Sequence, residues 1–167
     1  MRAKRLELYG RPLLDENNGI EMLCERRDSR LNFMSDAITL YPSNGRILTL
    51  VNEAIHQSCI IYVYRATSPD QAPAANDMLD KLQKLMTLAP AHAPGAHALV
   101  WAGFVGAAES ASKEHRKFFA DYLIDLYNPT GFGNIIKAMD HLKEIWRKQG
   151  KVRWTRLLQE LPTVFIM

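Results

Sequence analysis

The sequence predicts an all-α fold, a single helical domain packed around a central buried helix. One segment, residues 97–110, has small or apolar side chains on nearly every side of a helix, as expected for a helix in the middle of a domain. Most segments around it place apolar residues three and four positions apart, which is helical spacing. In addition, no segment elsewhere in the chain can be identified as the partner of a β-strand.

The central segment, HALVWAGFVGAAES, also contains two rows of small residues. Ala102 and Gly106 lie four positions apart, as do Gly103 and Ala107, so neighbouring backbones can approach closely. We therefore expect Gly106→Leu to push a neighbouring helix away and Gly106→Ala to be much milder. The volume between the helices is expected to be filled by the larger residues Leu99, Trp101, Phe104 and Val105.

A membrane span is one alternative for this part of the chain, because residues 85–108 contain no Asp, Glu, Lys or Arg. Pro90, Pro94 and Gly95 interrupt this run, and the remaining part is shorter than the roughly 20 apolar residues that cross a bilayer. The sequence therefore predicts a buried core helix and no contact with a membrane.

Length and composition predict one soluble intracellular domain. The chain has 167 residues and a net charge of +3 from 21 basic and 18 acidic side chains, a balance that does not indicate a nucleic-acid surface. Its two cysteines, Cys24 and Cys59, are interpreted as reduced core thiols rather than as a disulfide. The N-terminus has no apolar stretch of the kind found in secretory signals.

Residues 1–45 are expected to form an irregular or short-helical N-terminal segment, because glycine, proline and asparagine interrupt every apolar cluster. Short helices are predicted at 21–27 and 30–40, and whether the segment packs on the domain is left open. Residues 46–167 form the predicted domain. Its first helix covers about 46–64, with Ser43 or Asn44 as N-cap. The stretch CIIYVYR at 59–65 has strand-like composition, but helix is favoured because no partner strand is identified.

Four more helices accompany the central one, each with turn or capping residues at its ends. The first covers about 75–88 and ends before Pro90. The second begins at an N-cap at Ser112 and is closed by Asn128, Pro129 and Gly131. The third runs from Gly133 and Asn134 to a stop at Gly150, and the last runs from Trp154 to Pro162.

No catalytic, cofactor-binding or metal-ligating residue can be assigned. The five histidines are scattered, and none forms a metal-ligand pair on one helix. GFGN at 131–134 resembles a phosphate-binding turn, but it lacks a third glycine and follows a helix, so a turn before a helix is favoured. No GxSxG motif occurs. We therefore expect a protein that is not an enzyme.

The C-terminal quarter is basic, with an aromatic residue in its middle, Trp154. Such a patch can bind the backbone of a nucleic acid, but a solvated helix face with cations at its favourable C-terminal end is the preferred interpretation. The basic residues are Lys143, Arg147, Lys148, Lys151, Arg153 and Arg156.

Four short motifs occur in a characteristic order: LVWAGFVGAAES at 99–110, HRKFF at 115–119, GFGN at 131–134 and LKEIW at 142–146. This order resembles the C-terminal regulatory domain of fungal transcription factors whose N-terminal DNA-binding module is a six-cysteine binuclear zinc cluster. The resemblance covers about residues 46–167. Ala102 stands where many members have proline, and Ala107 and Ala108 stand where a Gly-Cys pair is common. Matching family-motif and core positions are Leu99, Val100, Trp101, Phe104, Glu109, Arg116, Phe119, Asn134 and Trp146.

The resemblance implies an all-helical regulatory or protein-interaction domain of a nuclear DNA-binding factor that controls RNA polymerase II transcription. Its implied partners are proteins of the transcription machinery or a second copy of the chain, without direct binding to nucleic acid by this fragment. No cofactor is expected in this chain, and zinc is expected only in the N-terminal DNA-binding module. Two other hypotheses remain: a helical domain that binds a small apolar effector against the Trp101 helix, and a helical enzyme.

Overall fold

The computed structural model describes residues 44–70 and 72–161, which form six α-helices and one 3₁₀ turn and contain no β-strand. The short helices predicted at 21–27 and 30–40, together with Cys24, Ser43 and Pro162, lie outside the described residues. The elements are α3 (Gly45–Thr67), α4 (Asn76–Leu88), η2 (Ala96–Leu99), α5 (Val100–Glu109), α6 (Lys113–Thr130), α7 (Gly133–Lys148) and α8 (Trp154–Glu160).

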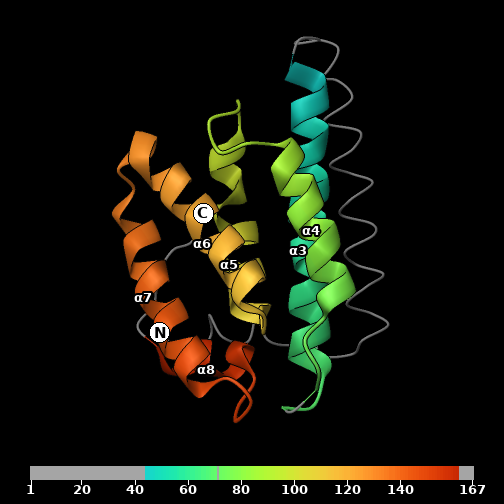
Figure 1. Cartoon of the computed structure of the whole chain (residues 1–167), viewed down its shortest axis with the longest axis vertical. Coiled ribbons are helices and arrows are strands. Elements are labelled where there is room, and N and C mark those ends of the chain that lie inside the picture. Colours follow the sequence, from blue (N-terminus) through green and yellow to red (C-terminus); the bar gives the residue numbers. More distant parts are fainter. Residues whose placement is uncertain (1–43, 71, 162–167) are drawn as a thin grey trace, which may run out of the picture.

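Helix α5 lies in the middle of the molecule, with α3 and α4 on one side and α6 and α7 on the other (Figure 1). Every residue of α5 is buried except Trp101, which is partly buried and stacks on Phe104 with 6.1 Å between the ring centroids. The predicted central helix thus begins as a 3₁₀ turn at Ala96 and becomes α-helical at Val100. None of the described helices is long and apolar enough to span a bilayer.

Helix α3 is a single continuous helix of 23 residues, about 35 Å long. CIIYVYR is helical throughout, as favoured from the sequence. Burial explains why these β-branched residues accept a helix: Ile61 and Val63 are buried, and α3 packs against both α4 and α5. Asn44 occupies the N-cap position but makes no capping hydrogen bond through its side chain. The predicted core position of Cys59 is wrong, because this side chain is only partly buried.

The two glycines of α5 lie where α6 crosses it. A Cβ added to Gly106 would lie 2.6–2.7 Å from three ring atoms of Phe119, which is fully buried. One added to Gly103 would lie 3.1 Å from Cδ2 of Leu123. The predicted close helix approach is therefore present at both positions. Even a methyl group at Gly106 meets the Phe119 ring, so Gly106→Ala also requires this ring to shift, and its comparison with Gly106→Leu remains a prediction.

The helix ends largely follow their sequence signals. Ser112 caps α6, since its Oγ accepts a hydrogen bond of 3.0 Å from the His115 backbone N–H. Helix α6 ends at Thr130, within the predicted closing segment of Asn128, Pro129 and Gly131. Pro129 removes one backbone donor from the last turn, and the helix ends directly after it at Gly131 (φ 64°), whose N–H donates to the carbonyl of Tyr127. Helix α7 ends at Lys148, shortly before Gly150 (φ 82°).

Candidate functional site

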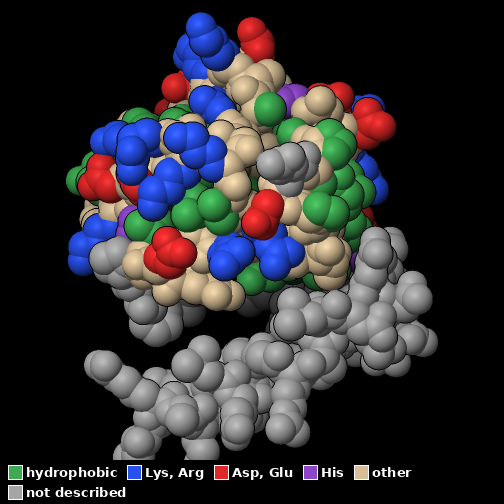
Figure 2. Space-filling model, turned by 90° about the horizontal axis from the view of Figure 1, so that it is seen from below, with side chains coloured by type: hydrophobic (Ala, Val, Ile, Leu, Met, Phe, Trp, Pro, Cys, Tyr) green, Lys and Arg blue, Asp and Glu red, His purple; other side chains and the backbone are tan. Residues whose placement is uncertain are grey.

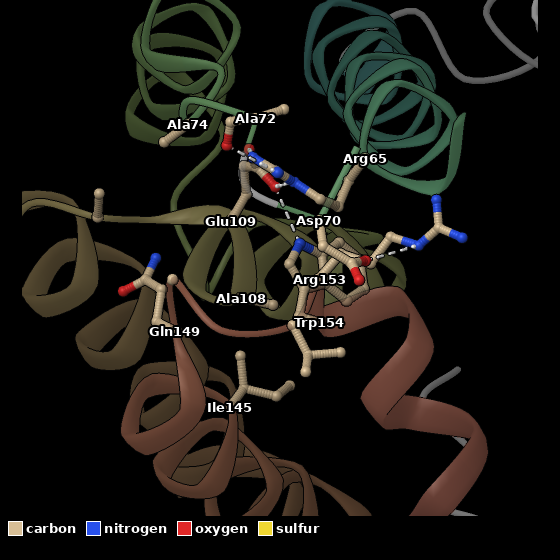
Figure 3. A pocket seen from close by; sticks show the side chains of 13 residues that line it. Arg65, Asp70, Ala72, Ala74, Ala108, Glu109, Ile145, Gln149, Arg153 and Trp154 are labelled. Atoms are coloured by element: carbon tan, nitrogen blue, oxygen red, sulfur yellow. Dashed lines mark hydrogen bonds and ion pairs between the residues drawn. The ribbon is translucent and has the colours of Figure 1, made fainter. Parts of the chain in front are cut away.

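The candidate site is centred on the buried carboxylate of Glu109, the last residue of α5 (Figure 3). Its two oxygens accept four hydrogen bonds. Arg65 donates from Nε (2.8 Å) and Nη2 (2.5 Å), and Trp154 donates from Nε1 (2.9 Å). The backbone N–H of Ala75 donates the fourth, at 3.0 Å. One side chain thereby joins the C-terminal end of α3, the segment before α4 and the start of α8.

Arg65 completes this network on its other side. Its Nη1 donates to the carbonyl of Ala72 (3.0 Å), and its Nη2 also donates to the carbonyl of Pro73 (3.0 Å). The hydrogen bond to Glu109 raises the pKa of Arg65 above its usual value and outweighs the lowering by burial. A buried charge pair is tolerated when further hydrogen bonds satisfy its remaining donors and acceptors, as they do for Arg65 and Glu109.

A second cluster lies at the C-terminal ends of α5 and α7. Arg116 donates from Nε to the carbonyl of Ser110 (3.1 Å) and from Nη2 to Oε1 of Gln149. Its guanidinium lies 5.3 Å from the ring centroid of Trp146, a cation–π distance. Trp146 in turn donates from Nε1 to the carbonyl of Ala107 at 2.8 Å. The HRKFF and LKEIW motifs therefore meet at the end of the central helix.

A cavity of about 270 Å³ opens beside Glu109. Small and apolar residues, among them Ala108, Ile145 and Val152, form much of its wall. Arg65 and Trp154 also line it and point toward Glu109 (Figure 3). Trp101 does not line this cavity, but Ala108 and Glu109 at the C-terminal end of the same helix do, so the cavity lies against one end of the helix at which the sequence places a small apolar effector.

The nine predicted family-motif positions divide into three groups. Leu99, Val100, Phe104 and Phe119 are fully buried core residues. Glu109 is the centre of the first network, and Arg116 with Trp146 forms part of the second. Two positions, Trp101 and Asn134, are partly buried and do not line the cavity.

Sequence reasoning missed the partners of Glu109. Arg65 lies 44 residues before it, inside the segment interpreted only as a helix end, and nothing in the local pattern marks it as buried. Trp154 was assigned to the last helix and to the basic patch, but it is buried and donates to Glu109. The signal that was available is that an acidic residue closing an otherwise apolar helix needs a buried cation or several donors.

The described residues offer little for metal or acid–base chemistry. They contain no group of three or more His, Cys, Asp or Glu side chains that could hold a metal ion. A six-cysteine zinc cluster does not fit this chain either, because the sequence has two cysteines. Glu109 already accepts four hydrogen bonds and has no oxygen available to act as a base.

The basic C-terminal residues are largely paired with carboxylates, as expected for a solvated face. Figure 2 shows this end of the molecule, with acidic side chains among the Lys and Arg side chains. Arg147 and Lys148 both contact Glu144 and lower its pKa to about 2. Lys143 pairs with Asp140 at 2.8 Å. Trp154 is buried, so it cannot stack on a nucleic-acid base.

The sequence model of a family described as the fungal specific transcription factor domain matches residues 10–166. The chain belongs to this family. The resemblance seen in the motifs is thus confirmed, and the match extends upstream of residue 46 into the N-terminal segment. No curated protein and no solved structure matches the chain.

Membership in the fungal specific transcription factor domain family assigns this chain a role in the regulation of transcription. The family suggests a nuclear location and transcription-related partners. The all-helical architecture agrees with the expectation from the motifs.

Proposed function

We propose that this chain is the regulatory domain of a zinc-cluster transcription factor and acts through effector or protein binding rather than catalysis. The family match over residues 10–166 carries this proposal. The hydrogen-bond network around Glu109 supports it, because it joins α3, α5 and α8 and so links their relative positions. A ligand or partner that binds one arrangement of these helices more tightly than another shifts the population of that arrangement.

We further propose that different parts of the factor have different roles. Zinc and DNA binding belong to an N-terminal cysteine-rich module, and this domain operates in the nucleus on RNA polymerase II transcription. The two cysteines and the net charge of +3 support this assignment, since neither provides for a zinc cluster or a strong electrostatic DNA surface.

A reporter assay in a fungal cell tests the proposal. Residues 1–167 are fused to an unrelated DNA-binding module, and transcription of a reporter is compared with that of the module alone. The fusion should change reporter output, and Gly106→Leu should alter that change because it displaces Phe119. Gly103→Ala serves as the matched control on the same helix. Output equal to that of the module alone, at equal protein level, would contradict the proposal.

Protein contact is proposed as one route of regulation, with the transcription machinery or a second copy of the chain as partner. The observation that favours it is the pair Phe132 and Ile136, large apolar side chains that are 47% and 39% exposed at the start of α7. Sedimentation of the wild-type chain beside Phe132→Ser tests self-association. A wild-type dimer that becomes monomeric in the variant supports a second copy, whereas monomers in both exclude it at the concentration used.

A further inference from the structure

We propose that the cavity beside Glu109 binds a small organic acid, with its carboxylate at a cationic rim and a compact apolar body against the inner wall. This inference rests on the proposed regulatory function, for which it names the effector class. It also places the effector at the C-terminal end of α5, away from Trp101.

Size and wall chemistry restrict the ligand to a small and partly apolar molecule. The volume of about 270 Å³ lies just below the usual range of small-molecule sites, which begins at about 300 Å³. Ala108 and Ile145 are buried and face the cavity together with the partly buried Val152. A branched aliphatic group would remove this wall from water, which favours binding in proportion to the apolar area covered.

The buried ion pair does not supply the ligand's counter-charge. Glu109 and Arg65 neutralise each other, and both oxygens of Glu109 already accept two hydrogen bonds each. An ammonium ligand would therefore find no available oxygen on Glu109. The charge that attracts a ligand has to come from the partly exposed groups at the opening.

Asp70, which lines the cavity, faces two guanidinium groups: Arg153, which also lines it, and Arg156, which lies outside the lining. Asp70 lies 3.5 Å from Nε of Arg153 and 3.7 Å from Nη1 of Arg156, longer than ordinary charge-assisted hydrogen bonds. Arg153 uses its Nη1 on the carbonyls of Ala66 and Ser68, which fixes its position at the end of α3. The two guanidinium groups and the one carboxylate leave an excess of one positive charge around Asp70, next to the opening.

The C-terminal end of α7 also carries more positive than negative charges. Arg147 and Lys148 share the single carboxylate of Glu144, and Lys151 forms no ion pair within the part of the chain that the structure describes. Lys148 and Lys151 flank Gln149 and Gly150 in the sequence, and these two residues line the cavity. The rim therefore carries a net positive charge, and it attracts a carboxylate more than an ammonium or a neutral amide.

Titration calorimetry on the whole 167-residue chain tests the inference with three probes that share one carbon skeleton. They are 4-methylpentanoate, its neutral amide and 4-methylpentylamine. The acid should bind saturably, and the amide and amine should bind at least about tenfold more weakly, because they lack the charge that the rim attracts. Raising the salt concentration should weaken binding of the acid and leave that of the amide unchanged.

Two matched substitutions decide whether the rim is responsible. Asp70→Asn removes the carboxylate that competes for Arg153 and Arg156, so it should strengthen binding of 4-methylpentanoate by about two- to fivefold. Asp140→Asn removes an exposed carboxylate that pairs with Lys143 and does not line the cavity, so it should change nothing. Ala74→Leu should fill the cavity and abolish binding at an unchanged unfolding midpoint.

Three results would overturn the inference: no saturable heat with the acid, equal binding of the acid and its amide, or an Asp70→Asn variant that binds the acid no better than wild type. The reporter assay separates this inference from the proposed function. If the acid binds as described while the fusion leaves the reporter unchanged, the regulatory function fails and the site stands. If the fusion regulates the reporter but the acid does not bind, the proposed function stands and the proposed site is rejected.

Discussion

Glu109 has no exposed side-chain surface, yet it carries a charge and accepts four hydrogen bonds. Removing one partner of a buried ion pair leaves the other charge without compensation, and this costs more than the pair itself contributes. The importance of Glu109 therefore lies in the groups it satisfies, above all the guanidinium of Arg65.

Glu109→Gln is expected to destabilise the domain by about 3–5 kcal/mol. The amide has one acceptor oxygen in place of two and turns its NH₂ group toward donors, so Arg65 remains buried without a counter-charge. Urea unfolding followed by circular dichroism measures the change. Glu144→Gln, at a partly exposed ion pair on α7, provides the control and should leave the midpoint nearly unchanged. A Glu109→Gln midpoint equal to wild type would show that the buried pair is not required for stability.

A second prediction compares the two glycines of α5. Gly106→Ala should destabilise by about 1–3 kcal/mol, because its methyl group meets the Phe119 ring, and Gly106→Leu should cost more. Gly103→Ala should stay within about 1 kcal/mol of wild type, since its gain in helix propensity offsets a small displacement of Leu123. Denaturant midpoints of the three variants give the order. Equal midpoints for both alanine variants would refute the close packing of α6 at Gly106.

Among the elements, α6 has the best-defined start. Ser112 Oγ accepts from the His115 N–H, one of the backbone donors that a helix leaves unpaired at its N-terminus. Ser112→Ala should therefore lower stability by about 1 kcal/mol, and Ser112→Asp should restore most of it because aspartate caps equally well. The measurement is thermal unfolding of both variants beside wild type. A loss that Asp fails to restore would mean that Ser112 acts through something other than the cap.

The elements were predictable from sequence because their signals are local. The spacing of apolar residues gave the helices, and Ser112, Gly131 and Gly150 marked their ends. CIIYVYR could be interpreted correctly only because no partner strand was identified. The predicted capping role of Asn44 was wrong in part, since the residue stands at the N-cap position and makes no capping hydrogen bond.

The candidate site was predictable only in its motif residues. Glu109, Arg116 and Trp146 were named from the resemblance, but their contacts were not. Arg65 and Trp154 lie 44 and 45 residues from Glu109, and no helical period relates positions so far apart. The cavity depends on the same packing, because its wall combines residues from α3, α5, α7 and α8.

For the whole molecule, we expect the isolated chain to bind neither zinc nor one DNA duplex in preference to another. Two cysteines, no metal-binding group among the described residues, and a basic end whose charges are mostly paired motivate this prediction. Metal analysis after dialysis and duplex titration at two salt concentrations provide the measurements. Stoichiometric zinc, or nanomolar binding to one duplex that weakens with salt, would contradict it.

The four donors to Glu109 also impose an order on synthesis of the chain. A ribosome makes Arg65 and Ala75 before Glu109, so these donors already exist when the carboxylate emerges. Trp154 follows 45 residues later. Helix α8 is therefore the last of these partners to be made, and its docking completes the set of donors around the carboxylate.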